Sequence, residues 1–335
     1  MTKLRISDQD NSLWRYGKRI RKLTTIVVLG LYLSACSIVS AQGGRITAPI
    51  ATPGVTPTLS PLEAKIPVFD HIIMIMFENQ DYQQVIGNPD MPTFNQLAAQ
   101  NVLLTNYYAV THPSLPNYIA LIGGDTFGIT SNCTDCFIDQ PSLPDLIEAS
   151  GMTWKTYQED IPSPCFVGNS GEYVQKHNPF IYFDPIRNNP DRCKQDIVSL
   201  IQLDQDLAAN QLPNFAFIMP NLCDDAHSCS LAVADQWLNQ LIQKLISSQA
   251  LGQNYLIYIA FEESRGDNSS CCGLSAKAGG RVPAILISPL SKSGYKDDTP
   301  LSHYSLLKTI LTSWKLSELG FTEKSTTQAI TAPWK

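Results

Sequence analysis

The stretch HIIMIMF at residues 71–77, followed at once by Glu78 and Asn79, decides the fold of this chain. Two later runs, NFAFIM at 214–219 and NYLIYIAF at 254–261, have the same unbroken apolar character. Short runs of this kind are typical of strands buried on both faces, as in a parallel sheet. We therefore expect all three to be strands of one parallel sheet.

Polar residues able to hold a metal ion or a phosphate follow each of these runs. They are Glu78 and Asn79 after the first, Asn221, Asp225 and His227 after the second, and Glu262 and Glu263 after the third. In parallel sheets ligands bind beyond the carboxyl ends of the strands, so the three groups are expected to converge on one site. Three such endings together favour an enzyme.

The remaining segments predict helices that alternate with further strands. Helical patterns cover 93–100, 142–150, 196–209, 230–249 and 302–314, and strand patterns cover 102–109, 154–157 and 282–288. Ser142 and Asp145 have the spacing of a capping box. Strands that alternate with helices predict an α/β domain, a three-layer α/β/α sandwich with a mainly parallel sheet.

The N-terminal region has the features of an export signal. Five Lys and Arg residues between 15 and 22 precede an apolar stretch at 26–33 that is short for a membrane span. Residues 33–36, Leu-Ser-Ala-Cys, resemble a bacterial lipobox, which predicts a lipoprotein signal peptide at 1–35 and a diacylglycerol group on Cys36. The alternative is an ordinary signal peptide with an incidental cysteine.

The composition of the following segments predicts the domain organisation. Residues 36–65 are rich in Pro, Thr, Ser and Gly and are interpreted as a lipidated cysteine followed by a flexible tether. The folded domain is expected at 66–333. Within it, 158–195 contains Pro and Cys with little periodicity and is interpreted as an irregular insertion.

The charge of the exported part argues against some partners. Residues 1–35 hold seven of the 24 Lys and Arg and two of the 30 Asp and Glu, which leaves 17 against 28, a net charge of −11. An acidic chain is not expected to bind nucleic acid or a membrane through a basic face. We therefore expect membrane attachment only through the lipid on Cys36, at the outer face of a bacterial membrane or envelope, with secretion as the alternative. The sequence does not indicate an oligomeric state.

Eight of the nine cysteines lie beyond Cys36, and an even number in an exported chain predicts disulfides. Their connectivity stays open at this point. Cys133 and Cys136 have the spacing of half a zinc site, but no second pair of this spacing accompanies them. A bridge between Cys223 and Cys229 would hold the loop that contains Asp225 and His227.

The most distinctive motif is THPSLPNY at 111–118, followed by the apolar segment IALIGG. Proline is tolerated in the first turn of a helix, which places Ser114 at a helix N-terminus, where free amides favour an anion. A hydroxyl at this position, next to a metal ion, is suited to attack phosphorus. The alternative is that Ser114 only caps the helix. We prefer the interpretation as a nucleophile.

With these motifs the chain resembles the bacterial and fungal phosphoesterase family, which includes acid phosphatases and non-haemolytic phospholipases C. The resemblance rests on FENQDY at 77–82, the motif at 111–118, residues 221–227, FEES at 261–264 and SHYS at 302–305. It spans residues 68–318 and implies an alkaline-phosphatase-like fold.

The resemblance also implies a metal centre and a nucleophile. By position, Glu78, Asn79, Ser114, Glu262 and Glu263 match the residues that hold one divalent metal ion, whose identity the sequence does not reveal. Oxygen ligands of this kind suit a hard cation. The family usually has Asp-Glu at the last pair, so Glu262 is a departure, and the direct ligand of the two stays open. Ser114 matches the nucleophile, and Asn117 is expected to contact phosphate oxygens.

Three histidines and one aspartate complete the implied catalytic residues: His112, Asp225, His227 and His303. A histidine can bind a phosphoryl oxygen or protonate the leaving group. Ser228 stands where the family often has an aspartate. His177, in the insertion, is interpreted either as structural or as facing the substrate.

Taken together, these residues predict a metal-dependent phosphomonoesterase that acts on a small phosphate ester through a phosphoserine intermediate. A phospholipase C or another phosphodiesterase with the same centre is the first alternative, and the lack of a long C-terminal extension favours monoesters. A catalytically silent surface lipoprotein is the second, since Glu262 and Ser228 depart from the family pattern.

Overall fold

The computed structural model describes residue 61 and residues 63–335, which belong to one compact unit. The expected signal peptide at 1–35, the lipid on Cys36 and nearly all of the expected tether lie outside the described residues. Within the described part of the chain, no helix is both long and apolar enough to cross a membrane.

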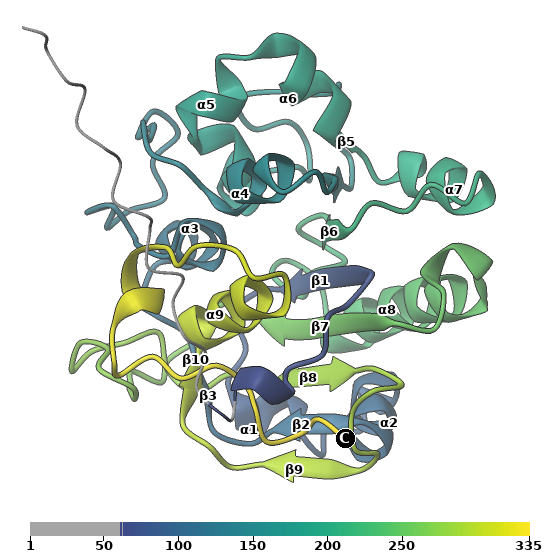
Figure 1. Ribbon diagram of the computed structural model, residues 1–335, viewed down its shortest axis with the longest axis vertical. Helices are drawn as coiled ribbons and strands as arrows, with labels where there is room; N and C mark the ends of the chain where they lie inside the picture. Colours follow the sequence, from purple (N-terminus) through teal and green to yellow (C-terminus); the bar gives the residue numbers. More distant parts are fainter. Residues whose placement is uncertain (1–60, 62) are drawn as a thin grey trace, which may run out of the picture. The chain divides into compact units, whose positions relative to one another are not determined.

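The centre of the fold is an eight-stranded sheet, which Figure 1 shows from β5 at the top to β9 at the bottom. Its strand order is β5-β4-β6-β1-β7-β8-β2-β9. The strands are β1 (His71–Phe77), β2 (Val102–Leu104), β4 (Trp154–Gln158), β5 (Ile197–Ser199), β6 (Phe215–Met219), β7 (Tyr255–Phe261), β8 (Ala284–Ile287) and β9 (Tyr295–Asp297). Only β8 runs antiparallel to its neighbours, β7 and β2, so the expected mainly parallel sheet is confirmed.

Helices cover both faces of this sheet. They are α1 (Tyr82–Val85), α2 (Pro92–Gln100), α3 (Ser114–Gly123), α4 (Leu143–Ala149), α5 (Asp184–Arg187), α6 (Pro190–Asp196), α7 (Ile201–Ala208), α8 (Leu231–Ser247) and α9 (His303–Ser313). Helix α3 packs against α9 and α4, and α2 packs against α8 on the other side (Figure 1). The three-layer α/β/α arrangement is therefore confirmed.

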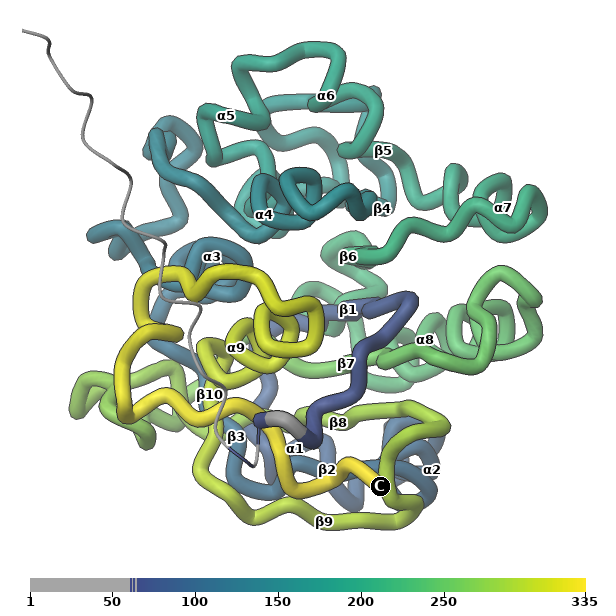
Figure 2. Tube along the Cα trace, in the orientation of Figure 1, coloured from purple at the N-terminus to yellow at the C-terminus, as the bar shows by residue number. Residues whose placement is uncertain are grey.

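Strand β1 lies between β6 and β7, and this position explains its unbroken apolar sequence. Every side chain from Ile72 to Phe77 is fully buried. Figure 2 shows the segment that leads into β1 beside the C-terminal segment, and the rings of Phe69 and Trp334 meet there at 5.4 Å. The two ends of the described chain thus pack against each other in the same hydrophobic core.

Two predicted elements differ from the structure. Residues 196–209 form β5 and α7 instead of one helix, because Ile197 and Val198 are buried where β5 pairs with β4. Residues 102–109 form two strands, β2 in the large sheet and β3 (Tyr107–Tyr108), which pairs with β10 (Leu301–Ser302). The insertion at 158–195 contains the short helices α5 and α6 and two 3-10 turns, η2 (Gln175–His177) and η3 (Pro179–Tyr182).

The eight cysteines of the described residues form four disulfides. The pairs are Cys133–Cys136, Cys165–Cys193, Cys223–Cys229 and Cys271–Cys272. The expectation of disulfides is confirmed, and the bridge between Cys133 and Cys136 leaves no thiolate there for zinc. The bridge between Cys223 and Cys229 encloses Asp225 and His227.

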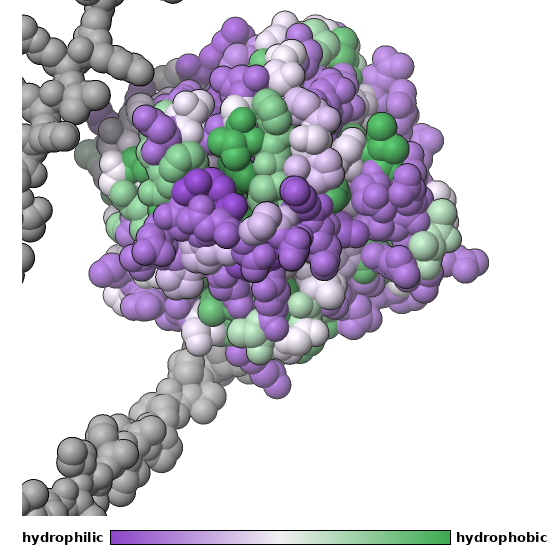
Figure 3. Space-filling view, turned by 90° about the horizontal axis from the view of Figure 1, so that it is seen from above, coloured by the Kyte–Doolittle hydropathy of each residue, from purple (hydrophilic) through white to green (hydrophobic). Residues whose placement is uncertain are grey.

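The surface is mainly hydrophilic on the face in Figure 3, where hydrophobic residues occur only in small groups. Across the described residues, the exposed large apolar side chains lie on separate elements, for example Ile201 on α7 and Ile246 on α8. Single apolar side chains of this kind are ordinary on a globular surface.

Candidate active site

The ends of β6, β1 and β7 meet because these strands are neighbours in the sheet. Backbone hydrogen bonds continue past the strand ends: Glu78 N donates to Asp225 O at 2.8 Å, and Glu262 N donates to Phe77 O at 3.0 Å. The three polar groups that follow the apolar runs therefore lie together at one edge of the sheet.

Ser114 is the first residue of α3 and points into this group. Its side chain is buried, and Oγ lies 3.1 Å from Glu78 Oε2 and 3.0 Å from Glu263 Oε1. The single hydroxyl hydrogen can be donated to either carboxylate. A buried hydroxyl between two proton acceptors, at the N-terminus of a ten-residue helix, has the setting of an activated nucleophile.

Asn117 holds the loop that leads to Ser114. Its Oδ1 accepts hydrogen bonds from the amides of Val110 and Thr111 at 2.8 and 3.1 Å. Its Nδ2 donates to the carbonyls of Thr111 and Pro113 at 2.7 and 3.3 Å. Sequence reasoning expected this amide to contact phosphate oxygens, but here both of its polar atoms bind the loop backbone. The arrangement supports a role in positioning Ser114.

Three carboxylates crowd around the serine. Glu78, Glu262 and Glu263 are buried, and the side-chain amide of Asn79 donates to Glu262 Oε1 at 3.1 Å and to Glu263 Oε1 at 2.8 Å. Burial, together with the nearby charges of Glu78 and Glu263, raises the pKa of Glu262 well above its usual range. A buried carboxylate stays ionised only where a positive partner lies beside it.

His177 supplies part of that positive charge, and sequence reasoning did not assign it. Its Nε2 lies 3.0 Å from Glu78 Oε1, and its Nδ1 lies 3.2 Å from Asp225 Oδ2. Burial opposes the charged form of His177, but Glu78 and Asp225 together raise its pKa. Burial likewise opposes ionisation of Glu78, yet His177 and Lys176 hold its pKa well below the usual range.

Lys176 is the second residue that sequence reasoning missed. Its Nζ lies 3.2 Å from Glu78 Oε2 and 3.2 Å from Ser114 Oγ, and only 15% of its side chain is exposed. Both residues belong to η2 in the irregular insertion, so periodicity could not point to them. The available signal was a Lys-His pair in a strongly acidic chain, directly before Asn178 and Pro179.

The other three histidines occupy different positions around the centre. His112 pairs with Glu263, and this hydrogen bond raises the pKa of the imidazole. His303 is fully buried behind the site, where Nε2 lies 2.6 Å from the carbonyl oxygen of Glu262, and burial lowers its pKa to about 4. His227 is exposed on the rim, with Nδ1 3.2 Å from Ser228 Oγ. Among the described histidines, only His112 has an imidazole ring that both pairs with a site carboxylate and has access to solvent.

A cavity of about 370 Å³ opens over these residues. Asn79, His112, Glu263, His227 and Arg265 are among the residues that line it. Of the predicted metal and nucleophile residues, Asn79 and Glu263 line the cavity, and the buried Ser114 contacts Glu263.

The residue types at the site fit a divalent cation. Carboxylate and amide oxygens are hard ligands, and Glu262 forms no ion pair within the described residues. In the present arrangement, no group of three or more His, Cys, Asp or Glu side chains in the described part of the chain is set up to hold a metal ion. Hydrogen bonds to Asn79 and Lys176 occupy these oxygens instead.

Comparison with known proteins gives a matching family and several relatives. Residues 88–317 match the model of the Phosphoesterase family. An acid phosphatase of Aspergillus fumigatus is 34% identical over 261 residues, which are 75% of this chain and 56% of that protein, so the chain spans little more than half its length. A phosphatidylinositol-3-phosphatase of Mycobacterium tuberculosis is 29% identical over 272 residues, covering 80% of this chain and 84% of that protein.

Solved structures show the same fold. A protein in the alkaline phosphatase superfamily from Vibrio parahaemolyticus matches with a TM-score of 0.53 and 13% identity, over 76% of this chain and 70% of that chain. A lipoteichoic acid synthase from Listeria monocytogenes matches with a TM-score of 0.51 and 11% identity, over 80% and 78%. The expected alkaline-phosphatase-like fold is confirmed.

Proposed function

Since the chain belongs to the phosphoesterase family, we propose that it hydrolyses phosphate monoesters through a phosphoserine on Ser114. The observation that carries this proposal is the buried Oγ of Ser114, held between Glu78 and Glu263 at the start of α3. The acid phosphatase and phosphatidylinositol-3-phosphatase among the relatives support the same class of reaction.

In the first half of the reaction, Ser114 Oγ attacks phosphorus. The Oγ–P bond forms, the bond from phosphorus to the ester oxygen breaks, and the hydroxyl proton passes to Glu263 or Glu78, which lie within 3.1 Å. The positive end of the α3 dipole favours the phosphoryl charge. In the second half, water loses a proton to His112 and attacks phosphorus, the Oγ–P bond breaks and releases phosphate, and Oγ takes back the proton held by Glu263 or Glu78.

Basic side chains have distinct roles in this scheme. The ammonium of Lys176, 3.2 Å from Ser114 Oγ, stabilises negative charge on that oxygen. His177, held by Asp225, keeps Glu78 ionised and in place. His112, at the open mouth and with a raised pKa, is the best placed group to protonate the departing ester oxygen.

The same residues would hold one divalent cation. Glu78, Asn79, Glu262 and Glu263, with Ser114, would be its ligands. Such a cation, when bound, lowers the pKa of the serine hydroxyl and stabilises charge on the phosphoryl oxygens. The chain's own contribution is to keep these oxygens buried and close to the nucleophile.

Location outside the cytoplasm is part of the proposal. Four disulfides are typical of proteins that fold in an oxidising compartment. Attachment through a lipid on Cys36 would be the membrane contact. Mass spectrometry of the mature protein from a bacterial host would detect or exclude the acyl chains.

The function is tested with purified protein and two substrates, phenyl phosphate and bis(nitrophenyl) phosphate. We expect phosphate release from the monoester, loss of activity in a chelator and recovery with a divalent ion. Faster turnover of the diester would favour a phosphodiesterase, and no turnover of either, with any divalent ion, would favour a silent lipoprotein.

Ser114→Ala tests the mechanism. We expect at least a 1,000-fold loss of turnover, because the nucleophile is removed. Ser313→Ala is the matched control, since Ser313 is also a buried serine on a helix but donates to Pro67 O outside the site. Acid quenching of the wild type during turnover should trap one phosphoryl group on Ser114. Near-normal activity of Ser114→Ala would rule the mechanism out.

A further inference from the structure

A second cavity adjoins the mouth of the active site. Its volume is about 680 Å³, within the range of sites for small molecules. Four residues line both cavities: Gln80, Ala226, His227 and Arg265. A molecule bound in the first cavity, which Glu263 lines, can therefore extend into this second cavity, which we call the side pocket.

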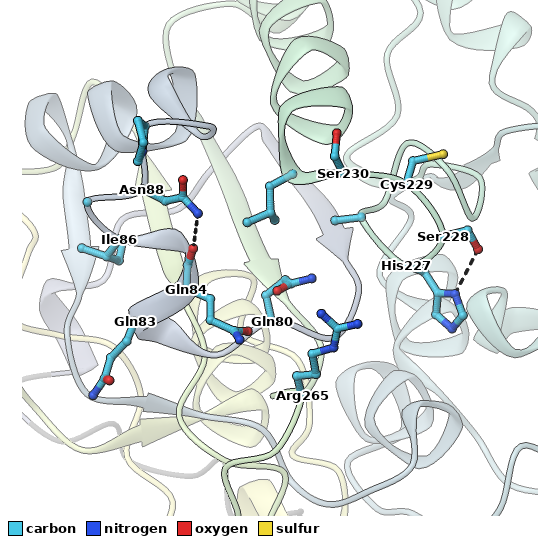
Figure 4. Close-up of a pocket in the computed structure, with 14 residues that line it drawn as sticks. Gln80, Gln83, Gln84, Ile86, Asn88, His227, Ser228, Cys229, Ser230 and Arg265 are labelled. Carbon is cyan, nitrogen blue, oxygen red and sulfur yellow. Dashed lines mark hydrogen bonds between the residues drawn. The ribbon is translucent and has the colours of Figure 1, made fainter.

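The side pocket offers hydrogen bonds and little apolar surface. Figure 4 shows the side chains of Gln83, Gln84 and Asn88 on one side and those of His227, Ser228 and Ser230 on the other. Its apolar side chains are few, chiefly Ile86 and Leu231. Amide and hydroxyl groups of this kind suit a ligand with several hydroxyl groups.

Arg265 gives the side pocket its charge. No carboxylate lines the pocket, and the guanidinium forms no ion pair within the described residues. The backbone amide of Arg265 is fixed by a 2.9 Å hydrogen bond to Asp81 Oδ1. In Figure 4 the side chains of Arg265 and Gln80 point toward each other, between the segment of Gln83 and the loop of His227. An unpaired cation at a cavity mouth in an acidic chain attracts an anion.

Arg265 lies close in the chain to a carboxylate that contacts the nucleophile. Arg265 follows Glu263 by two residues, and Glu263 Oε1 lies 3.0 Å from Ser114 Oγ. Two residues of extended chain span at most about 7 Å. Arg265 and Glu263 also line the same cavity, so Arg265 can meet a second anionic group on the small molecule whose phosphate Ser114 attacks.

We propose that the side pocket binds the leaving group of the substrate, and that this group is polyhydroxylic and carries a second negative charge recognised by Arg265. The inference rests on the proposed function and adds the substrate class to it. The substrate is then a soluble sugar- or polyol-type phosphate ester with a further carboxylate or phosphate. An acyl chain finds no apolar wall of matching size in this pocket.

Two esters that differ only in the second charge test the proposal. They are 6-phosphogluconate, which carries a carboxylate, and sorbitol 6-phosphate, which has a hydroxymethyl group in its place. For the wild type we expect kcat/KM to favour 6-phosphogluconate about tenfold, through KM. In Arg265→Ala this preference should fall to about one, and Arg265→Lys should retain part of it, because the charge remains.

Lys296→Ala is the control for charge, because it removes one positive charge from β9 and lines neither cavity. It should keep the tenfold preference. A wild type without preference, or a preference that survives Arg265→Ala, would overturn the inference while leaving the proposed function intact. Failure to release phosphate from these esters and from phenyl phosphate would instead defeat the proposed function.

A lipid substrate is the other outcome of the test. Glycerol 3-phosphate and a lysophosphatidic acid share the same scissile phosphate, and only the second has an acyl chain. We expect no gain in kcat/KM from the acyl chain. A gain of more than tenfold would show that the leaving group is apolar and would overturn the inference.

Discussion

Two groups of acidic side chains in this protein have opposite surroundings. The strand-end cluster, Glu78, Asp225, Glu262 and Glu263, is buried beneath the open cavity. The helical cluster, Asp145, Glu148 and Asp196, lies around Arg192 where α4 and α6 meet. Both hold several carboxylates, but they are neutralised in different ways.

In the helical cluster one guanidinium forms ion pairs with two carboxylates. Arg192 Nη1 lies 2.8 Å from Asp145 Oδ1, Nε lies 2.7 Å from Glu148 Oε1, and the guanidinium lies over the ring of Trp154. In the strand-end cluster Glu262 has no ion pair within the described residues, although it is completely buried.

The difference separates charges that stabilise the fold from charges kept for chemistry. Paired carboxylates near the surface contribute to stability in small amounts. Buried carboxylates in excess of their partners are unfavourable for folding and are found where a cation or a reaction uses them. Replacing a carboxylate of the strand-end cluster by a neutral group should therefore raise the free energy of unfolding. Removing the cation that pairs with the carboxylates of the helical cluster should lower it.

The largest effect is expected from Glu262→Gln. This change removes an ionisable group from the crowded cluster and keeps the shape of the side chain. We expect at least a 100-fold loss of phosphate release, because a predicted metal ligand is lost. In the presence of a chelator, we expect the free energy of unfolding to rise by about 1 kcal/mol, because Gln, unlike Glu262, does not have to take up a proton to be buried beside Glu78 and Glu263.

Urea unfolding with chelator and phosphate release with added metal measure both quantities on the same preparation. An inactive variant that is also less stable without metal would contradict this interpretation, since Glu262 would then act as a structural residue. Asn79 must keep one acceptor in the variant, which the side-chain carbonyl of Gln can provide.

The strand-end cluster also shows what the sequence could predict. Three apolar runs with polar endings suffice to place Glu78, Asp225 and Glu262 at one edge, because parallel neighbours end at the same edge of a sheet. The helix predicted over residues 197–199 was wrong, because pairing of this segment with β4 outweighs its local helical periodicity. Local pattern therefore predicts central strands better than an edge strand.

His177 and Lys176 could not be predicted in the same way. They lie in an irregular segment between β4 and β5. Both contact Glu78, which precedes Lys176 by 98 positions and His177 by 99 positions in the sequence. The present partners of Asn117 could not be predicted for another reason, since its motif fixes the position but not the direction of the amide. Residues on loops need the tertiary structure before their partners are known.

Arg192→Ala tests the helical cluster. We expect the free energy of unfolding to fall by about 1–2 kcal/mol, since two ion pairs and the contact with Trp154 are lost. The value of kcat should stay within about twofold of the wild type, because the cluster lines neither the mouth nor the side pocket. Chemical unfolding and steady-state kinetics check the two expectations, and a strong loss of kcat without a loss of stability would erase the distinction between the clusters.

The smallest effect concerns Asp196, the one carboxylate of the helical cluster that is not in direct contact with Arg192. Burial, and then the charge of Glu148, raise its pKa to about 6, although Arg192 and Lys155 oppose the shift. The folded state therefore binds more protons than the unfolded state between about pH 4 and pH 6, so stability from this group decreases as the pH rises through that window.

Asp196→Asn should remove this dependence, because the amide resembles the protonated carboxyl and does not titrate. We expect equal stability of variant and wild type near pH 3.5 and an advantage of about 0.5–1 kcal/mol for the variant at pH 8, an amount reduced for partial solvent screening. Urea unfolding at both pH values measures it. If the variant were instead less stable at pH 8, the attraction of Arg192 and Lys155 would exceed the cost of burial, and Asp196 would belong with the paired carboxylates of its cluster.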